Sequence, residues 1–210
     1  MEKIKQKMRK YGKWILVILF LVIFFEMIED IFQNEIHNFD NTIYYLVEKT
    51  IHYPVTEIMK IITVLGSAIP ILTICIVSFV LFKNKVYGKY ISLNLFVIVL
   101  LNQTMKYVFQ RPRPTQFRLI DESGYSFPSG HSMVSMAFYG FLLYLVWKKV
   151  KNPYAKWGIC SLLSLLIFFI GYSRIYLGVH YASDVMGGFC FSLAYLIVYT
   201  TFIKKELEKR

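Results

Sequence analysis

The sequence has few cysteines, and none is spaced for a disulfide framework or a zinc site. Cys75, Cys160 and Cys190 each lie inside an apolar run, and no two of them form a C-x-x-C pair. Isolated cysteines in such runs are typical of small buried apolar side chains. The pattern disfavours a disulfide-stapled fold and a cysteine-based metal centre, and it carries no information on the redox compartment.

Charge is also scarce for a chain of 210 residues. Charged residues make up 18% and hydrophobic residues 56%, with only 13 Asp and Glu against 24 Lys and Arg. The mean hydropathy is +0.48. A soluble domain of this size carries more charge and fewer long apolar runs. No repeat or linker divides the chain, so we expect residues 1–210 to form a single integral membrane domain.

The net charge of +11 does not indicate a nucleic-acid-binding protein. The basic residues separate the apolar runs instead of gathering in one segment, and no nucleic-acid recognition motif is present. The sequence therefore predicts the lipid bilayer as a partner and no nucleic acid. It does not specify an oligomeric state.

The apolar runs predict an all-α, polytopic membrane protein with about six transmembrane helices. The expected spans are Trp14–Ile28, Ile61–Phe82, Tyr90–Phe109, His131–Trp147, Trp157–Tyr172 and Asp184–Ile203. The first run resembles the core of a signal peptide, but acidic residues follow it instead of a small-residue cleavage site. We therefore expect it to remain as a span.

The basic residues that flank these runs predict the topology. Four alternate flanks are basic: Lys3, Lys5, Lys7, Arg9, Lys10 and Lys13; Lys83, Lys85 and Lys89; Lys148, Lys149, Lys151 and Lys156; and Lys204, Lys205, Lys209 and Arg210. Both termini are therefore expected in the cytoplasm of a cell whose plasma membrane holds the protein. Segment 29–54, which is acidic, falls on the outer side. Within it, residues 40–51 have the spacing of a helix lying in the interface, which we interpret as a connector or, alternatively, a lid.

Five basic residues oppose this rule because they fall at the outer face: Lys106, Arg111, Arg113, Arg118 and Arg174. Four of them belong to KYVFQRPRP and SRIYLGVHYASD, Arg118 follows the first of these stretches, and a third polar stretch, FPSGHSM, opens the fourth span on the same face. Lysine and arginine suit phosphate oxygens. A serine hydroxyl at Ser129, a close backbone approach at Gly130 and the N-terminus of a helix add donors. Together these features predict an outer-face pocket for a tetrahedral dianion.

Two histidines accompany the cations. His180 and Asp184 are four residues apart, so on a helix they share a face, and the carboxylate can orient the imidazole as acceptor or nucleophile. His131, from another segment, can protonate a leaving oxygen. We interpret the set as a hydrolase of phosphomonoesters or diphosphates. Because three cations would repel a metal ion beside these groups, we expect no metal and no other cofactor.

The three stretches resemble the signature motifs of the type 2 phosphatidic acid phosphatase family, which comprises lipid phosphate phosphatases related to vanadium haloperoxidases. The family pattern is K-x6-R-P, P-S-G-H and S-R-x5-H-x3-D. Its fixed positions match Lys106, Arg113 and Pro114; Pro128, Ser129, Gly130 and His131; and Ser173, Arg174, His180 and Asp184. All eleven match in order and spacing, over residues 106–184.

The resemblance implies a metal-independent phosphatase with a phosphohistidine intermediate. His180 would be the nucleophile, Asp184 would orient it, and His131 would act as acid and then base. The implied phosphate ligands are Lys106, Arg113, Ser129, Gly130 and Arg174. The implied substrates are undecaprenyl diphosphate or phosphatidylglycerol phosphate, with phosphatidic acid as an alternative.

The substrate, the loop residues and the class of function each have more than one interpretation. We favour undecaprenyl diphosphate because Arg111 and Arg118 could meet a second phosphate, although solvent-facing roles suit them as well. Asp121 and Glu122 are interpreted as solvated loop residues. The alternative functions are a lipid-phosphate binder or transporter, which has no use for an oriented nucleophile, and a phosphatase for soluble esters.

Overall fold

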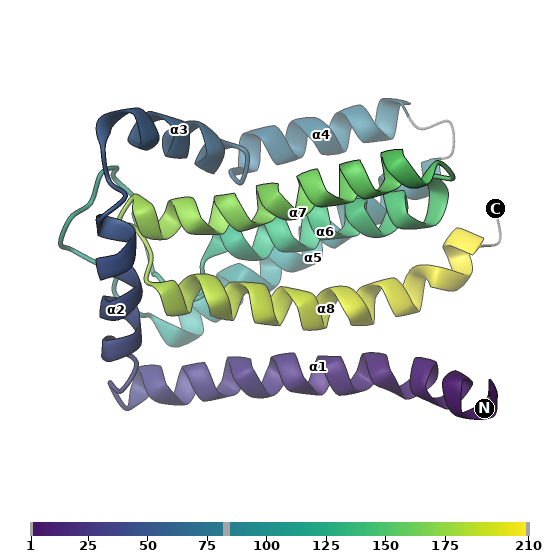
Figure 1. The fold of residues 1–210 in the computed structure, drawn as a ribbon, viewed down its shortest axis with the longest axis horizontal. Helices are drawn as coiled ribbons and strands as arrows, with labels where there is room; N and C mark the ends of the chain where they lie inside the picture. Colours follow the sequence, from purple (N-terminus) through teal and green to yellow (C-terminus); the bar gives the residue numbers. More distant parts are fainter. Residues whose placement is uncertain (1, 82–84, 209–210) are drawn as a thin grey trace.

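The structure is a computed structural model that describes residues 2–81 and 85–208, and every regular element in those residues is a helix. Figure 1 shows the helices lying side by side along one long axis, except for one short helix that crosses an end of the bundle. The helices are α1 (Glu2–Phe32), α2 (His37–Glu48), α3 (Tyr53–Val64), α4 (Ala68–Leu81), α5 (Lys85–Phe109), α6 (Gly130–Lys149), α7 (Pro153–Tyr176) and α8 (Ala182–Glu208).

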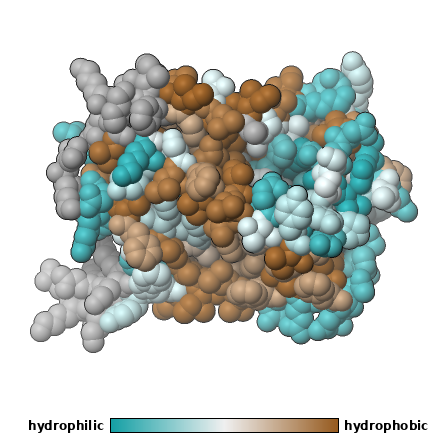
Figure 2. All heavy atoms as spheres, turned by 180° about the vertical axis from the view of Figure 1, so that it is seen from behind, coloured by the Kyte–Doolittle hydropathy of each residue, from teal (hydrophilic) through white to brown (hydrophobic). Residues whose placement is uncertain are grey.

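The predicted helical membrane fold is confirmed, while the predicted number of six spans is approximate. Within the described residues, the helices α5, α6, α7 and α8 are long and apolar enough to cross a membrane, and the bent pair α3–α4 makes a fifth span if it counts as one. The first expected span, Trp14–Ile28, lies inside α1, which packs along α8. Figure 2 shows a hydrophobic band across the middle of the molecule, as a bilayer requires.

The second expected span is broken, which corrects the prediction of one continuous helix over Ile61–Phe82. The chain bends by 47° between α3 and α4. Pro70 explains the break, because proline lacks an N–H and its ring excludes a helical carbonyl four residues earlier, at Gly66. At the break, the Tyr139 hydroxyl donates to the Leu65 carbonyl at 2.7 Å. Phe82 lies outside the described residues, as do the predicted flanking bases Lys83, Lys209 and Arg210.

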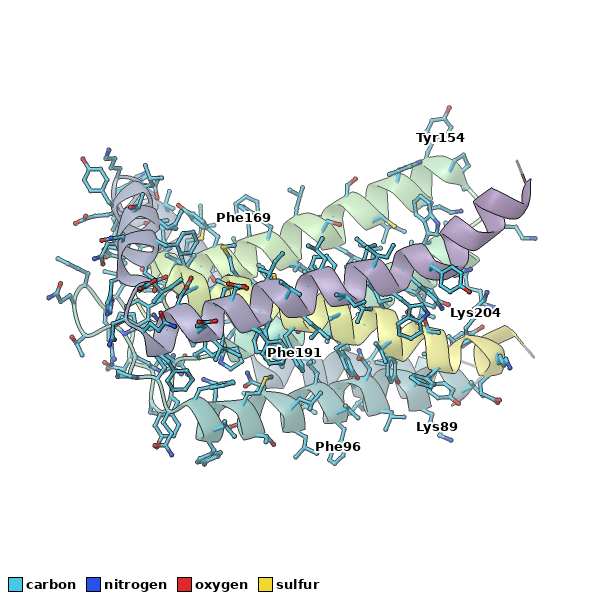
Figure 3. All side chains as sticks on the ribbon, turned by 90° about the horizontal axis from the view of Figure 1, so that it is seen from below. Lys89, Phe96, Tyr154, Phe169, Phe191 and Lys204 are labelled. Carbon is cyan, nitrogen blue, oxygen red and sulfur yellow. The ribbon has the colours of Figure 1, made fainter. Side chains whose placement is uncertain are left out.

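The bundle has two different ends (Figure 1). The start of α1, the end of α8 and the α6–α7 turn lie at one end, which we call the terminal end, and Figure 3 places Lys89, Tyr154 and Lys204 there. The opposite end, which we call the loop end, holds α2, residues 110–129 and the turn at 177–181. All three predicted motif stretches therefore reach the same end of the bundle.

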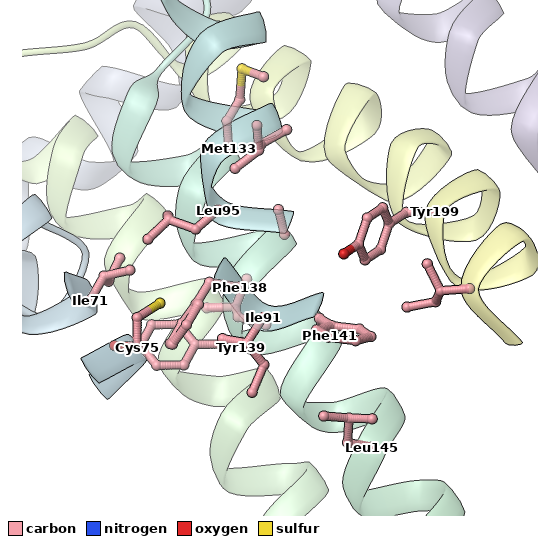
Figure 4. Close-up of a cluster of buried hydrophobic side chains, with 14 of the residues drawn as sticks. Ile71, Cys75, Ile91, Leu95, Met133, Phe138, Tyr139, Phe141, Leu145 and Tyr199 are labelled. Carbon is pink, nitrogen blue, oxygen red and sulfur yellow. The ribbon is translucent and has the colours of Figure 1, made fainter. Parts of the chain in front are cut away.

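The core lies between the long helices. Figure 4 shows Ile71 and Cys75 of α4, Ile91 and Leu95 of α5, Phe138 and Phe141 of α6, and Tyr199 of α8 in one buried cluster. The same cluster includes Ile167 and Ile170 of α7, so the core holds α4, α5, α6, α7 and α8 together.

The α2 helix confirms the helix expected near residues 40–51 and closes the loop end. Its Val47 packs in a second buried cluster with Tyr176 of α7 and Val185 of α8. Just past its end, Thr50 shares a hydrogen bond of 2.8 Å with the Tyr172 hydroxyl. The segment is therefore joined to the bundle by both apolar and polar contacts.

Candidate active site

The structure brings the predicted site residues together at the loop end. Lys106 sits in the last turn of α5, His131 in the first turn of α6, Arg174 in the last turn of α7 and Asp184 in the first turn of α8. His180 lies in the α7–α8 turn. A polar cavity of about 330 Å³ is lined by Lys106, Arg113, Gly130, His131 and His180, among others. Ser129, Arg174 and Asp184 are buried behind this lining.

His180 is held on both ring nitrogens. Arg113 Nη1 donates to Nε2 at 2.9 Å. A guanidinium has no acceptor, so Nε2 carries no proton and the hydrogen resides on Nδ1. Nδ1 faces Asp184 Oδ2 at 3.4 Å and Ser126 Oγ at 3.3 Å. The contacts therefore fix a tautomer that presents the Nε2 lone pair, as a nucleophile requires.

Asp184 is fully buried, and both of its oxygens accept hydrogen bonds. Oδ2 accepts from Ser126 Oγ at 2.5 Å and from the Tyr181 backbone N–H at 2.8 Å. Oδ1 accepts from Arg111 Nη1 at 2.6 Å. These contacts hold the carboxylate still beside His180, and Arg111 adds a charge partner that lies away from the cavity.

Burial governs the ionisation of His180. It lowers the pKa of this histidine to about 4, even though the hydrogen bond and the charge of Asp184 raise it. The charges of Arg174 and Arg113 contribute to this lowering of the pKa. The imidazole is therefore neutral at physiological pH, and a neutral imidazole keeps its lone pair for attack.

His131 has a very different environment. It is only partly buried, and its ring forms no hydrogen bond within the part of the chain that the structure describes. It lines the polar cavity and also an apolar cavity of about 900 Å³ between α4, α5 and α6. A Cβ placed on Gly66, at the α3–α4 break, would lie 3.1 Å from His131 Cδ2. The break therefore provides the space next to this ring.

The P-S-G-H turn is held by its neighbours. Ser129 is the N-cap of α6, and its Oγ accepts from the Ser132 backbone N–H and from the Ser132 hydroxyl. Asn102, one turn before Lys106 on α5, donates to the Pro128 carbonyl at 3.1 Å. A Cβ on Gly130 would lie 3.0 Å from Asn102 Oδ1, so glycine permits this close approach. Within the described residues, the N–H groups of Gly130 and His131 make no hydrogen bond, and both residues line the polar cavity.

Glu122 corrects the prediction of a solvated loop residue. Its carboxylate contacts the Arg174 guanidinium and lies 3.9 Å from Arg113. Burial would raise the pKa of Glu122, but Arg174 and Arg113 outweigh it and lower that pKa. Glu122 therefore places a negative charge where the sequence predicts a phosphate. Arg174 also donates to Thr63 of α3 at 2.7 Å, and its Nε has no partner within the described residues.

Arg111 corrects a second prediction. It neither faces solvent nor reaches the cavity, because it is buried and paired with Asp184 and with Asp40 of α2. Arg118 is exposed and donates to the Pro114 carbonyl at 2.5 Å. Neither arginine lines the polar cavity.

The residues that the sequence analysis missed are Asp40, Thr63, Asn102 and Ser126. Asn102 had a readable signal, because it precedes Lys106 by four residues and so shares its helix face. The other three carry no local pattern, since their partners are brought to them only by the fold.

Comparisons with known proteins identify the family of the chain. Residues 87–208 match the PAP2 superfamily. Phosphatidylglycerophosphatase B of Bacillus subtilis (strain 168) is 33% identical over 156 residues, which cover 71% of this chain and 75% of that protein. An undecaprenyl-diphosphatase of Sulfolobus acidocaldarius is 25% identical over 187 residues, which cover 86% of each.

A solved structure is similar along almost the whole chain. The crystal structure of a transmembrane PAP2-type phosphatidylglycerolphosphate phosphatase from Bacillus subtilis superposes with a TM-score of 0.80 at 29% identity, covering 93% of this chain and 97% of that one. These matches confirm the family resemblance, the multi-pass helical membrane fold and the expectation of a lipid phosphatase: the chain belongs to the PAP2 superfamily.

Proposed function

We propose that this lipid phosphatase removes a terminal phosphate through a phosphohistidine intermediate on His180, without a metal ion. The observation that carries the proposal is the junction of two cavities. The polar cavity is lined by Lys106, Arg113 and His180, and the apolar cavity runs between α4, α5 and α6. Both cavities are also lined by Gly130 and His131. A phosphate in the first and a hydrocarbon chain in the second would place the scissile bond beside His131.

The phosphate ligands would be Lys106, Arg113 and the N–H groups of Gly130 and of the next residue in α6. In the present geometry the Lys106 ammonium donates to the Tyr125 carbonyl, at the edge of the polar cavity. The motif residues Ser129 and Arg174 complete the proposed set. Ser129 shapes the turn, and Arg174 becomes available when the substrate phosphate displaces the Glu122 carboxylate. The unpartnered Arg174 Nε supports this exchange.

The proposed reaction has two displacements. Nε2 of His180 attacks phosphorus, the bond to the leaving oxygen breaks, and His131 gives that oxygen a proton. Asp184 stabilises the positive charge that develops on the imidazole. In the second step His131 takes a proton from water, the water oxygen attacks phosphorus, and the P–N bond breaks to release phosphate and free His180.

The choice of lipid rests on fewer observations. Arg111 and Arg118 do not support a second phosphate, because Arg111 is paired with Asp40 and Asp184 and Arg118 lies outside the cavity. We therefore propose phosphatidylglycerol phosphate as the first candidate, supported by the 33% identical phosphatidylglycerophosphatase B. Undecaprenyl diphosphate is the second candidate, supported by the undecaprenyl-diphosphatase that aligns over 86% of this chain.

We further propose that the loop end faces the outside of the cell and that both termini are cytoplasmic. The support is the position of basic side chains such as Lys89 and Lys204 at the terminal end (Figure 3). Exposed positions at the two ends offer a test. A thiol introduced by Asp121→Cys should react with a membrane-impermeant reagent in intact cells, and one introduced by Tyr154→Cys only after permeabilisation. The reverse pattern would overturn the orientation.

Phosphate release by the purified protein in detergent, with excess EDTA, tests the proposed function. Phosphatidylglycerol phosphate, undecaprenyl diphosphate, phosphatidic acid and a short-chain soluble ester would be compared, with His180→Ala as the control. We expect release that survives EDTA, requires a long apolar chain and disappears in the variant. Loss of release with EDTA would contradict the metal-free mechanism. Equal rates for long and short chains would favour a soluble ester, and binding without release would indicate a lipid-phosphate binder.

A further inference from the structure

A buried row of charges runs from Asp184 away from the cavity to α2. Arg111 Nη1 donates to Asp184 Oδ1 at 2.6 Å, and Arg111 Nη2 donates to Asp40 Oδ2 at 2.7 Å. Asp40 is only 3% exposed and Arg111 only 7%. The row joins the first turn of α2, the segment after α5 and the first turn of α8. In sequence, Asp40 lies 71 residues from Arg111 and Asp184 lies 73 residues from it.

Further hydrogen bonds hold the row in place. The Ser183 backbone N–H donates to Asp40 Oδ1 and its hydroxyl to Asp40 Oδ2, both at 2.8 Å. Arg111 also lies over the Tyr181 ring, 4.2 Å from its centre. Burial would lower the pKa of Arg111, but Asp184 and Asp40 outweigh it and raise that pKa. The guanidinium is therefore always charged, and its two carboxylates are fixed on either side of it.

The net charge of this row determines how well it stabilises a positive charge on His180. Asp184 and Arg111 by themselves would form a neutral pair, and a neutral pair stabilises an adjacent cation poorly. With Asp40 included, two carboxylates face one guanidinium, and the row carries one net negative charge. When Nε2 of His180 is phosphorylated, the imidazole becomes a cation whose Nδ1–H points at this row.

We propose that Asp40 is a positioning residue of the reaction, which neutralises Arg111 so that the negative charge of Asp184 remains available to His180. The inference rests on the proposed role of His180 as nucleophile. In this proposal α2 contributes to catalysis indirectly, because it supplies the carboxylate of Asp40, which does not contact the substrate.

The charged and titratable groups around His180 come from every neighbouring element. Arg113 and Glu122 lie in the segment between α5 and α6, Lys106 on α5, His131 on α6, Arg174 on α7 and Asp184 on α8. These groups face the ring or the cavity, whereas Asp40 and Arg111 lie behind Asp184. A change at Asp40 or Arg111 therefore alters the charge behind the carboxylate without removing a ligand of the phosphate.

The test measures phosphoenzyme formation against pH for the full-length protein in detergent, with p-nitrophenyl phosphate as the probe. The variants are Asp40→Asn, Arg111→Gln, the double variant Asp40→Asn/Arg111→Gln, and Asp40→Glu. Loss of a negative charge disfavours the imidazolium, so Asp40→Asn should move the acid limb of His180 to lower pH by on the order of half to one pH unit. It should also slow phosphoenzyme formation by roughly tenfold.

The other variants test whether the acid limb of the pH profile shifts in the direction that the change in charge predicts. Arg111→Gln removes a positive charge, so the limb should move to higher pH. The double variant keeps one net negative charge in the row, so the pH of its acid limb should return towards that of the unaltered protein. Asp40→Glu keeps the charge of the row, so the pH of its acid limb should not change. The ionisation of the substrate is common to all variants and cancels in the comparison.

A merely structural role for Asp40 predicts a different result. Both single variants would then lose activity without opposite shifts, and the double variant would be the most impaired; that outcome overturns the inference. Thermal unfolding in detergent accompanies each variant, and if Asp40→Asn fails to fold, Arg111→Gln alone decides by the presence or absence of an upward shift. Absence of any phosphoenzyme in the unaltered protein would instead contradict the proposed function.

Discussion

The two histidines at the loop end differ in how firmly the protein holds them. His180 is buried, accepts a hydrogen bond from Arg113 and faces the carboxylate of Asp184. His131 is partly exposed, lines two cavities and makes no side-chain hydrogen bond in the described residues. A nucleophile gains from a fixed tautomer and direction, whereas a group that gives a proton to one oxygen and takes one from another needs freedom to turn.

This difference fits the two roles that the sequence predicts, with His180 as the nucleophile and His131 as the acid and base. Removal of the fixed histidine should abolish the covalent step, and removal of the free histidine should impair only the proton transfers. The following predictions are arranged from the largest expected effect to the smallest.

His180→Ala should abolish phosphoenzyme formation and reduce phosphate release by on the order of 10⁴-fold or more, because the variant lacks the group that attacks phosphorus in the covalent step. The measurement is trapping of acid-labile labelled protein after mixing with labelled substrate. Labelled protein that persists in this variant would assign the nucleophile to another residue.

His131→Ala should reduce release from a lipid phosphate by about 10²- to 10⁴-fold, the range of general acid catalysis. With p-nitrophenyl phosphate, whose leaving oxygen needs little protonation, labelled protein should still form and then accumulate, because the base for water is missing. Equal loss of label in both histidine variants would show that the two residues do not divide the roles.

The pH dependence of labelling should report the burial of His180. Because burial lowers the pKa of this histidine to about 4, the imidazole stays neutral as pH falls towards that value and becomes protonated only below it. In the His131→Ala background, the labelling rate should therefore stay constant down to about pH 4, after correction for the ionisation of the substrate. An acid limb near 6.5, the ordinary pKa of histidine, would contradict the buried environment.

Gly66→Ala should produce the smallest effect, and only on the free histidine. The added Cβ would lie 2.5 Å from Ile170 Cγ2 and 3.1 Å from His131 Cδ2, so one of these side chains has to move. We expect up to about a tenfold loss with the lipid substrate, on the scale of core overpacking, and no loss of labelling by p-nitrophenyl phosphate. Gly158→Ala is the matched control, because a Cβ there meets nothing within 4 Å. A loss of labelling in Gly66→Ala would place the damage at His180 instead.

The sequence predicts the helices well, and it predicts that the motif residues meet at one end of the bundle, because both depend on short-range patterns. Apolar runs of membrane length identify the long helices, and the spacing of Lys106, His131 and His180 places them at one end of alternating spans. The break between α3 and α4 also had a local signal in Gly66 and Pro70, which the prediction of one continuous span overlooked.

The remaining features depend on contacts that no local pattern encodes. Asp40 is a single carboxylate in an amphipathic helix, and its partner Ser183 is 143 residues away. Arg111 and Glu122 look like ordinary exposed charges until the fold places them against Asp184 and Arg174. Their contacts therefore depend on the folded structure and could not be predicted from the sequence.

The measurement that tests the account most directly is phosphoenzyme trapping in the presence of excess EDTA, with the unaltered protein, His180→Ala and His131→Ala side by side and p-nitrophenyl phosphate as substrate. We predict label on the unaltered protein, none on His180→Ala and accumulated label on His131→Ala. Label on His180→Ala, or no label on a folded His131→Ala, would contradict the assignment of His180 as the nucleophile.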